Sequence, residues 1–307
     1  MPDIVCLGEP MIEFNRQPPA KDGRVYWLEG HGGDTSNCAI AAARQGASAG
    51  YITAIGSDPF GDALMRLWAA ETVDSSAVIR RKDAPTGIYF VTHSERGHEF
   101  TFFRTGSAAS RLTTAEIPED YIANAKFFEA SAISQAISEG ANEAVLHAMA
   151  LAKKHGVAIA YDTNLRLRLW PLEKALPAIE AACRISDVVF TSDEEAAALW
   201  RHKDADAVAD AVFALGPATV VVKQGGKGAL IATRARRDHI AAHKVNVVDA
   251  TGAGDTFAGA FLARRLAGDD VFAAARYANA AAALKTEGYG AVAPIPRPDA
   301  VLKLLGR

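Results

Sequence analysis

Short runs of β-branched and apolar residues alternate with segments of helical periodicity along most of this chain, and that alternation limits the folds it can adopt. The runs that predict strands are 4–7, 49–55, 126–130, 157–161, 187–190, 219–223, 229–232 and 245–248. Helical periodicity appears over 38–44, 61–70, 139–155, 171–183, 193–201, 205–215, 254–267 and 271–286. The pattern predicts an α/β fold with a mostly parallel sheet flanked by helices, in which ligands bind near the carboxyl ends of the strands.

Two blocks near the N-terminus fall outside this rhythm. Residues 11–14 alternate in polarity, 25–28 can form a further short strand, and a second alternating block lies between Gly87 and Arg104. We expect the blocks to pair into a small sheet that covers a cleft on the main sheet. Because no internal repeat or low-complexity linker divides the chain, the expected organisation is a single domain, 1–307, with a lid formed by about 11–30 and 86–105.

The segment after the predicted strand at 245–248 has the composition of an anion-binding turn. Gly252-Ala253-Gly254 allows a sharp turn, and apolar residues at helical spacing follow from Asp255 onward. The unpaired N–H groups and the dipole of a helix start attract phosphate. A carboxylate there competes with the bound anion, so its presence indicates a chemical role. One such role is to accept the proton of an alcohol while the amides hold a phosphoryl group. The structural alternative is that Asp255 only caps the helix.

Residues 249–255, Asp-Ala-Thr-Gly-Ala-Gly-Asp, resemble the C-terminal signature of the ribokinase-like (PfkB) carbohydrate kinases. The resemblance covers nearly the whole chain and implies a ribokinase-like fold with a small β-sheet lid. It also implies that Asp255 is the catalytic base and that Gly252, Ala253 and Gly254 form the anion hole. Ala250 departs from the family pattern, which commonly has a hydroxyl residue or Pro there.

Residues 32–37, Gly-Gly-Asp-Thr-Ser-Asn, start an Ala-rich helix near the N-terminus. By themselves they are a glycine turn with a polar cap, although Asn37 offers both a donor and an acceptor. They resemble the N-terminal signature of the same family, which lines the sugar pocket, and this implies that Gly33 and Asn37 bind the substrate. The pair Asp34-Thr35 is similar to the version found in the 2-keto-3-deoxygluconate kinases of that family.

Two arginines follow a predicted strand in residues 162–170, Asp-Thr-Asn-Leu-Arg-Leu-Arg-Leu-Trp. A guanidinium fork suits a carboxylate better than an ammonium group does, although Arg166 and Arg168 can equally be solvated loop charges. The segment resembles the 2-keto-3-deoxygluconate kinases, in which the arginine at the position of Arg166 binds the substrate carboxylate. The same motif places Asn164 among the substrate-binding residues.

The predicted lid carries three further positions of this resemblance. Arg104 matches a second substrate arginine, and Tyr89 and Phe103 match lid positions at the sugar. The family often has tyrosines before the arginine, so Phe102 and Phe103 lack a hydroxyl that those tyrosines would provide. A tyrosine packed in the sheet is the structural alternative for Tyr89.

A glycine-rich loop follows another predicted strand in residues 223–228, Lys-Gln-Gly-Gly-Lys-Gly. It lacks the Walker A order, and a glycine hairpin is its structural alternative. The resemblance implies that ATP is bound by residues of this loop and of two helices, namely Lys223, Gly225, Gly228, Ser192 and Asn279.

Two cations are implied by the same resemblance. Glu195 matches the glutamate that holds Mg²⁺ through water, although Ser192 replaces the usual Asn and acidic residues in a first helical turn also complement the helix dipole. A monovalent cation such as K⁺ is implied near Asp249, Thr251 and the turn 288–290.

The composition excludes several other classes of protein. Half of the residues are hydrophobic and the net charge is −3, which fits a globular protein and not a general nucleic-acid binder. No apolar run is long enough for a membrane span, and the N-terminus reads as a strand rather than a signal peptide. Three scattered cysteines are too few for a disulfide framework or a zinc site. We therefore expect a cytoplasmic protein, with a homodimer or higher oligomer formed through the lid strands.

The motifs together predict an ATP- and Mg²⁺-dependent carbohydrate kinase. The resemblance favours phosphorylation of the terminal hydroxyl of a sugar acid, converting 2-keto-3-deoxygluconate to 2-keto-3-deoxy-6-phosphogluconate. The alternatives are a kinase for fructose, ribose, another neutral sugar or a nucleoside, and a non-catalytic sugar- or nucleotide-binding regulator. A dinucleotide-dependent dehydrogenase is disfavoured because no Gly-x-Gly-x-x-Gly follows the first strand.

Overall fold

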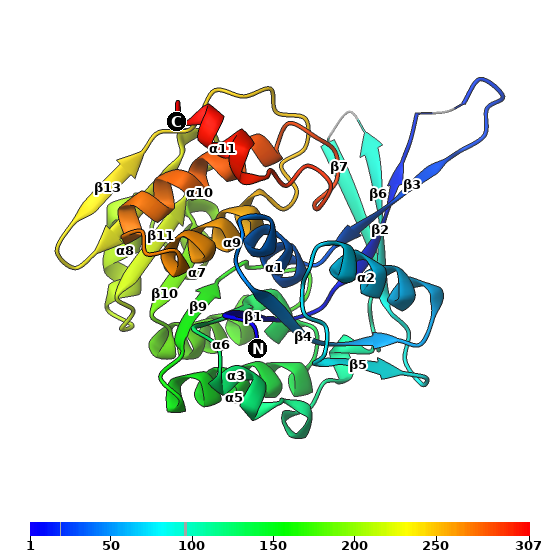
Figure 1. Cartoon of the computed structure of the whole chain (residues 1–307), viewed down its shortest axis with the longest axis horizontal. Helices are drawn as coiled ribbons and strands as arrows, with labels where there is room; N and C mark the ends of the chain where they lie inside the picture. The colour runs from blue at the N-terminus through cyan, green and yellow to red at the C-terminus, as the bar shows by residue number, and fades with distance from the viewer. Residues whose placement is uncertain (19, 95–96) are drawn as a thin grey trace.

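A computed structural model describes residues 1–18, 20–94 and 97–307 (Figure 1). Within these residues, a main sheet has the strand order β13-β12-β11-β10-β9-β8-β1-β4-β5. Neighbouring strands are parallel from β5 to β11, whereas β12 and β13 join one edge antiparallel. The strands are β1 (Ile4–Leu7), β4 (Ala49–Gly56), β5 (Val78–Arg81), β8 (Phe127–Ser131), β9 (Ala158–Asp162), β10 (Val188–Ser192), β11 (Thr219–Lys223), β12 (Ala229–Thr233) and β13 (Arg237–Ile240). The predicted α/β fold is confirmed.

Helices cover both faces of this sheet, because successive side chains of a strand point to opposite sides. In β1, Val5 and Leu7 pack into one helical layer while Ile4 and Cys6 pack into the other. The first layer contains α3 (Glu119–Ala123), α4 (Ala132–Ala136), α5 (Glu139–Lys154), α6 (Leu172–Ile185), α7 (Asp193–Leu199) and α8 (Ala205–Phe213). The second contains α1 (Asp34–Arg44), α2 (Pro59–Ala70), α9 (Ala253–Leu266), α10 (Val271–Lys285) and α11 (Pro298–Leu304).

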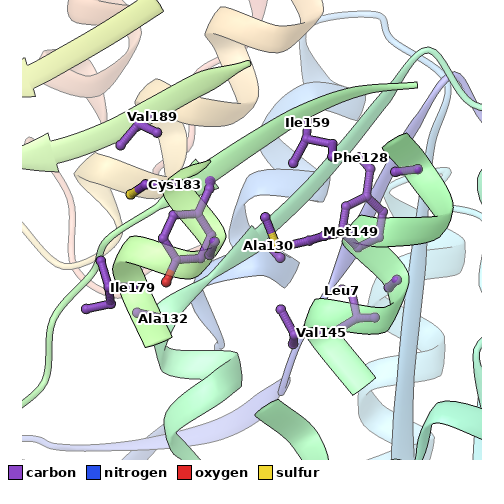
Figure 2. Packing of buried hydrophobic residues seen from close by; sticks show 14 of the residues in the cluster. Leu7, Phe128, Ala130, Ala132, Val145, Met149, Ile159, Ile179, Cys183 and Val189 are labelled. Atoms are coloured by element: carbon purple, nitrogen blue, oxygen red, sulfur yellow. The ribbon is translucent and has the colours of Figure 1, made fainter. Parts of the chain in front are cut away.

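Figure 2 shows the first of these layers from close by. Val145 and Met149 of α5 lie against the strand residues Leu7, Phe128 and Ile159, and all five side chains are buried (Figure 2). The Ala and Val side chains of α5 recur every three or four residues, so the helix presents one continuous apolar face to the sheet. Close packing on both faces makes the strand ends a rigid base for the loops that follow them.

A second, smaller sheet projects from the main body at the right of Figure 1. Its order is β3-β2-β6-β7, with β2 parallel to β6 and antiparallel to β3. Its strands are β2 (Met11–Arg16), β3 (Trp27–Gly32), β6 (Gly87–Ser94) and β7 (Gly97–Phe103). The ranges predicted for the lid include Pro19 and residues 95 and 96, which lie outside the described residues.

The strand predicted at 245–248 does not form. The N–H groups of Val248 and Asp249 both donate to the carbonyl of Thr286 just beyond α10, at 2.7 and 3.0 Å, so a helix end holds this segment instead of a neighbouring strand. Val247 is 67% exposed. The β-branched residues here form an extended wall of a cleft and not a buried strand.

The three cysteines are free and buried. Cys6 of β1 and Cys38 of α1, far apart in sequence, lie beside Glu129 of β8, with one ligand atom from each residue within 4.8 Å of the others. Burial raises the pKa of Glu129 well above its usual value, which favours the neutral carboxyl form in the core. A helix able to cross a bilayer is not found in the described part of the chain.

Candidate active site

A cleft of about 940 Å³ opens between the small sheet and the carboxyl ends of the main strands. It brings together residues that the sequence spreads over more than two hundred positions, which is the arrangement expected of a parallel sheet. The predicted site residues that line it are Gly33, Asn37, Tyr89, Arg104, Asn164, Arg166, Ser192, Glu195, Lys223, Gly225, Gly228, Gly252, Ala253, Gly254, Asp255 and Asn279. Among the residues predicted to bind substrate or nucleotide, Phe103 does not line it.

Asp255 lies in the first turn of α9, and Asn37 of α1 orients it. The Asn37 Nδ2 group donates to Asp255 Oδ2 at 2.8 Å. The two helices can approach this closely because Gly259, one turn after Asp255, has no side chain. A Cβ atom at Gly259 would overlap the Cys38 carbonyl oxygen of α1. Helix packing in the core therefore sets the distance between Asn37 and Asp255.

The carboxyl group of Asp255 is held near its ionisation midpoint at neutral pH. Burial is the main cause that raises its pKa to about 7, and the nearby Asp34 carboxylate adds to this effect. The hydrogen bond from Asn37 and the positive charge of Lys223 act in the opposite direction. A pKa close to neutrality suits a group that accepts a proton from an alcohol.

The turn before α9 presents N–H groups to the cleft. Gly252 has a φ of 79°, a left-handed conformation that residues with a Cβ rarely adopt. The Ala253 N–H donates back to the Ala250 carbonyl at 3.1 Å, so it does not face an anion as the sequence suggested. The N–H groups of Gly254 and Asp255 have no acceptor within the described residues. A Cβ at Gly254 would lie 3.1 Å from Lys223 Nζ, which places an ammonium group beside these two amides.

Lys223 belongs to a buried network of charges at the ends of β9, β10 and β11. Its Nζ donates to Asp162 Oδ2 at 2.6 Å. Burial alone lowers the pKa of Lys223, but the Asp162 and Glu195 carboxylates outweigh that effect and the pKa is raised, so the ammonium stays charged. Asp162 is the first residue of the 162–170 motif, which follows a predicted strand, but no role was predicted for it from the sequence.

Glu195 is the carboxylate available for a metal ion in this network. Its Oε2 accepts from Thr163 Oγ1 at 2.7 Å and from the Ser192 N–H at 3.3 Å, while Ser192 Oγ accepts from the Glu195 N–H at 3.2 Å. Glu195 Oε1 makes no hydrogen bond with a described residue and lies 3.7 Å from Arg166 Nη1. Burial raises the pKa of Glu195, and the Lys223 ammonium lowers it by a smaller amount, so the pKa stays above its usual value. A buried carboxylate with one free oxygen fits the single protein ligand that Mg²⁺ commonly takes beside nucleotide phosphates.

At the other end of the cleft, Arg104 is paired with a glutamate that sequence reasoning missed. Glu9, two residues after the end of β1, accepts from Arg104 Nε at 2.7 Å and also pairs with its Nη2 group. Ser107 Oγ donates to the second oxygen of Glu9. Arg104 Nη1 has no protein partner in the described part of the chain.

Asp34, the first residue of α1, is a third carboxylate for which no role was predicted from the sequence. Its Oδ2 accepts from Asn164 Nδ2 at 2.9 Å and from Ser131 Oγ. Its Oδ1 is buried and has no hydrogen-bond partner among the described residues. Burial raises the pKa of Asp34. Asp34 lines the cleft, and a buried carboxylate oxygen without a partner is suited to accept a hydrogen bond from a ligand hydroxyl that reaches it. The signal in the sequence was an Asp placed directly after the Gly-Gly turn.

The small sheet presents Phe102 to the cleft instead of Phe103. Tyr89 and Phe102 are cross-strand partners and both line the cleft, with ring centroids 5.5 Å apart. Phe103 pairs with Ile88, lies on the opposite face against Phe90, and is 60% exposed. Side chains alternate along a strand, so only one of the two phenylalanines can face the cleft, and it is Phe102 and not the predicted Phe103. The Tyr89 hydroxyl donates to Glu13 of β2.

The glycine-rich loop closes the far end of the cleft. Gly225 and Gly228 have φ values of 53° and 103°, and a Cβ at Gly228 would overlap the Ile240 carbonyl oxygen. Asn279 of α10 donates from Nδ2 to the Ala241 carbonyl at 2.9 Å, which fixes the extended segment that follows β13. The loop and this segment lie on either side of a space lined by small side chains of α10, Ala282 and Ala283.

A mostly parallel α/β sheet, a second small sheet over the strand ends and a carboxylate beside free amides at a helix start define a phosphotransferase of the sugar-kinase class. The chain belongs to the PfkB family of carbohydrate kinases, whose family model matches residues 1–298. It is 33% identical over 319 residues to "Probable fructokinase-5" of Arabidopsis thaliana, covering 99% of this chain and 97% of that protein. It is 34% identical over 311 residues to the "2-dehydro-3-deoxygluconokinase" of Thermoproteus tenax, covering 99% and 94%.

Solved structures agree with this assignment. A putative ribokinase II from E. coli in complex with ATP and Mg²⁺ has a TM-score of 0.92 and 26% identity, with both chains fully covered. A fructokinase variant from Vibrio cholerae O395, in fructose, ADP and potassium ion bound form, has a TM-score of 0.88 and 26% identity over 99% of this chain and 98% of that one. The ribokinase-like fold is confirmed, and relatives named for an acidic and for a neutral sugar are equally similar.

Proposed function

We propose that this sugar kinase transfers the γ-phosphoryl group of ATP to the terminal hydroxyl of a sugar acid, with 2-keto-3-deoxygluconate as the substrate. The supporting observation is the charge of the cleft: Arg104, Arg166 and Arg168 line the same space as Asp255. Glu9 pairs with Arg104 and Glu195 lies 3.7 Å from Arg166, whereas Arg168 has no charge partner among the described residues. A substrate carboxylate can take a bidentate hydrogen bond from a guanidinium group placed in this way.

In this mechanism the arginines hold the carboxylate and Asp34 Oδ1 accepts a hydrogen bond from a sugar hydroxyl. The Asp255 carboxylate then accepts the proton of the terminal hydroxyl as that oxygen attacks the γ-phosphorus, the bond from phosphorus to the β–γ bridging oxygen breaks, and ADP leaves. The Gly254 and Asp255 amides and the Lys223 ammonium stabilise the charge on the transferring phosphoryl group. Phosphoryl transfer depends mainly on this kind of positioning and electrostatic stabilisation.

ATP is proposed to lie along the glycine-rich loop, between Gly225, Gly228 and Asn279, with Ser192 nearby. Mg²⁺ would be held by Glu195 and the nucleotide phosphates, where it neutralises phosphate charge. The small sheet is proposed to act as a lid that excludes water, since water would otherwise compete with the sugar hydroxyl for the phosphoryl group.

Fructose is the second candidate substrate, and one contact favours it. Glu9 already neutralises Arg104, so this arginine can serve a neutral sugar as a hydrogen-bond donor without a net positive charge. The equal similarity to proteins named as fructokinases agrees with this alternative.

A substrate screen with ATP and Mg²⁺ separates the two candidates. Ketodeoxygluconate, fructose, ribose and adenosine would be compared by kcat/KM, and a clear preference for a neutral compound would overturn the sugar-acid proposal. The Arg166→Ala variant should raise KM for the sugar acid roughly tenfold or more, because a charged hydrogen bond contributes about 1.5–3 kcal/mol, and should change KM for fructose little. Arg184→Ala, which removes an exposed arginine of α6, is the control.

A further inference from the structure

Lys285, the last residue of α10, is a lysine with no exposed surface. Its Nζ donates to the Asp249 carbonyl at 2.9 Å. No described carboxylate lies within ion-pair distance of it. Burial lowers the pKa of Lys285, and the more distant carboxylates of Asp249, Asp255 and Glu13 offset only part of that effect. A fully buried ammonium that makes no close ion pair is rare, because its desolvation is costly. Such a group requires an explanation beyond packing.

The contact joins α10 to the start of the anion-binding turn. Asp249 is three residues before Gly252, and its carboxylate also bridges two segments: Oδ1 accepts from the Thr251 N–H at 2.8 Å and Oδ2 from the Gly290 N–H at 2.9 Å. Lys285 and Asp249 therefore fix the turn 249–252 against the segment 288–290 from the core side. The amides of Gly254 and Asp255 depend on that turn for their direction.

A second positively charged side chain donates hydrogen bonds to the backbone carbonyls of residues 292–295, which follow the turn 288–290. Arg44 of α1 donates from Nη1 to the carbonyls of Val292 and Ile295, at 2.9 and 2.6 Å, while its other edge pairs with Glu71. The carbonyl of Ala293 accepts from the same nitrogen at 3.3 Å. This segment thus has a built-in partner for its oxygens.

A monovalent cation needs several carbonyl or carboxylate oxygens turned toward one point. Here the Asp249 carbonyl is bound to Lys285, both Asp249 carboxylate oxygens accept backbone N–H groups, and Arg44 binds the carbonyls of 292, 293 and 295. Asp249, the carboxylate that the sequence suggested for K⁺, therefore already has each of its three oxygens bound to a protein group.

We propose that the ammonium group of Lys285 takes the place of a monovalent cation beneath the anion-binding turn, so that turnover does not depend on K⁺. Lys285 acts through Asp249 and the turn, and is therefore a positioning residue that contacts neither the sugar nor ATP. This inference rests on the proposed kinase function for its activity readout, and on the structure alone for its stability readout.

The first test uses the unmodified protein. Its turnover with the substrate identified in the screen would be measured in KCl and in tetramethylammonium chloride of equal ionic strength, and its melting temperature would be recorded in both salts. We expect the same rate and the same melting temperature. A several-fold higher rate in KCl, or a K⁺-specific rise in melting temperature, would overturn the proposal.

The second test removes the ammonium group. Lys285→Met keeps the length of the side chain and should lower kcat roughly 10- to 100-fold through a displaced turn. Lys285→Ala leaves space beside the Asp249 carbonyl, so K⁺ should recover part of its rate and raise its melting temperature, while tetramethylammonium should do neither. A merely structural lysine would give no such selective recovery.

Lys303→Met, at an exposed position of α11, is the matched control and should behave as the unmodified protein. Full activity of Lys285→Met, or Lys285→Ala without any response to K⁺, would contradict the proposal. If no sugar is phosphorylated in the screen, the kinase function fails, whereas the melting temperatures of the unmodified protein and of Lys285→Ala in the two salts still decide the role of Lys285.

Discussion

One side-chain contact, from Asn37 to Asp255, aims the proposed base, and removing the charge of that base gives the most direct prediction. Asp255→Asn preserves the shape of the side chain and leaves the backbone amides of residues 254 and 255 in place, so ATP should bind with near-unchanged affinity by calorimetry. Loss of a general base should lower kcat roughly 10²- to 10⁴-fold. Glu194→Gln, which alters an exposed acidic residue in the first turn of another helix, is the control. Near-normal turnover of Asp255→Asn would remove Asp255 from the base role.

The raised pKa of Asp255 predicts a pH dependence. The base acts in its ionised form, so kcat/KM should fall as the pH drops below the pKa of about 7 and level off above it. The Asn37 hydrogen bond lowers this pKa, so Asn37→Ala should move the limb to higher pH. A pH–rate series on both proteins measures this. A profile that is flat through neutrality, or a limb that moves to lower pH, would contradict the assignment.

Residues that the sequence predicts well are those whose chemistry is tied to a local turn. Asp255 follows its glycines directly, and Glu195 starts a helix after a strand. Glu9 and Asp162 were missed because their partners, Arg104 and Lys223, are 95 and 61 positions away. Nothing local distinguishes a buried carboxylate that will meet a distant cation from one that stays at the surface.

At the scale of an element, substitution of Gly252 tests how the start of α9 contributes to stability and to catalysis. Gly252→Ala must strain a φ of 79° and bring a Cβ within about 3.1 Å of the Ala291 carbonyl oxygen, so it should both destabilise the protein and disturb the anion-binding turn. Gly268→Ala is the matched control, because Gly268 follows the same helix at a φ of 97° with open space around it.

Both glycine variants should lose about 1–2 kcal/mol of stability in chemical unfolding. Only Gly252→Ala should lose more than roughly tenfold in kcat, since only that turn carries the phosphoryl-binding amides. Equal losses of kcat in the two variants would show that the turn has no special part in catalysis.

Helices and strands could be predicted from the sequence where burial gives them a regular pattern of apolar residues. The inner strands of the main sheet and the long helices α5, α9 and α10 follow from their apolar patterns. The edge strands β5 and β13 were absent from the prediction, because each has only four residues, carries charged side chains and has no fully buried residue. The strand expected at 245–248 was predicted wrongly, because its valines line the cleft wall. An apolar cleft wall has the same composition as a buried strand, so the sequence does not distinguish the two.

At the scale of the whole molecule, the small sheet leaves apolar surface and two edge strands exposed. Leu28 of the edge strand β3 is 55% exposed and Phe103 of the edge strand β7 is 60% exposed. Exposed edges that carry apolar side chains tend to pair with another chain. The expected homodimer through this sheet therefore stays a prediction with a clear physical basis.

Light scattering coupled to gel filtration would test that prediction. The protein should elute at twice the 32.4 kDa mass of one chain or at a higher multiple, and Leu28→Asp combined with Phe103→Asp should shift it toward the monomer. Leu167→Asp, at another exposed apolar position outside the small sheet, should not. A monomeric unmodified protein would rule out assembly through the lid.

The bare backbone of Gly259 ties the chemistry to the interior. A helix moves as a unit, so a side chain at Gly259 that pushed α9 away from α1 would also move Asp255 out of hydrogen-bond distance of Asn37. This would happen even if the domain stayed folded. The distance between α1 and α9 at Gly259, four residues after Asp255, therefore controls the geometry of the reacting carboxylate. An assay of turnover would detect a loosened core sooner than a melting curve would.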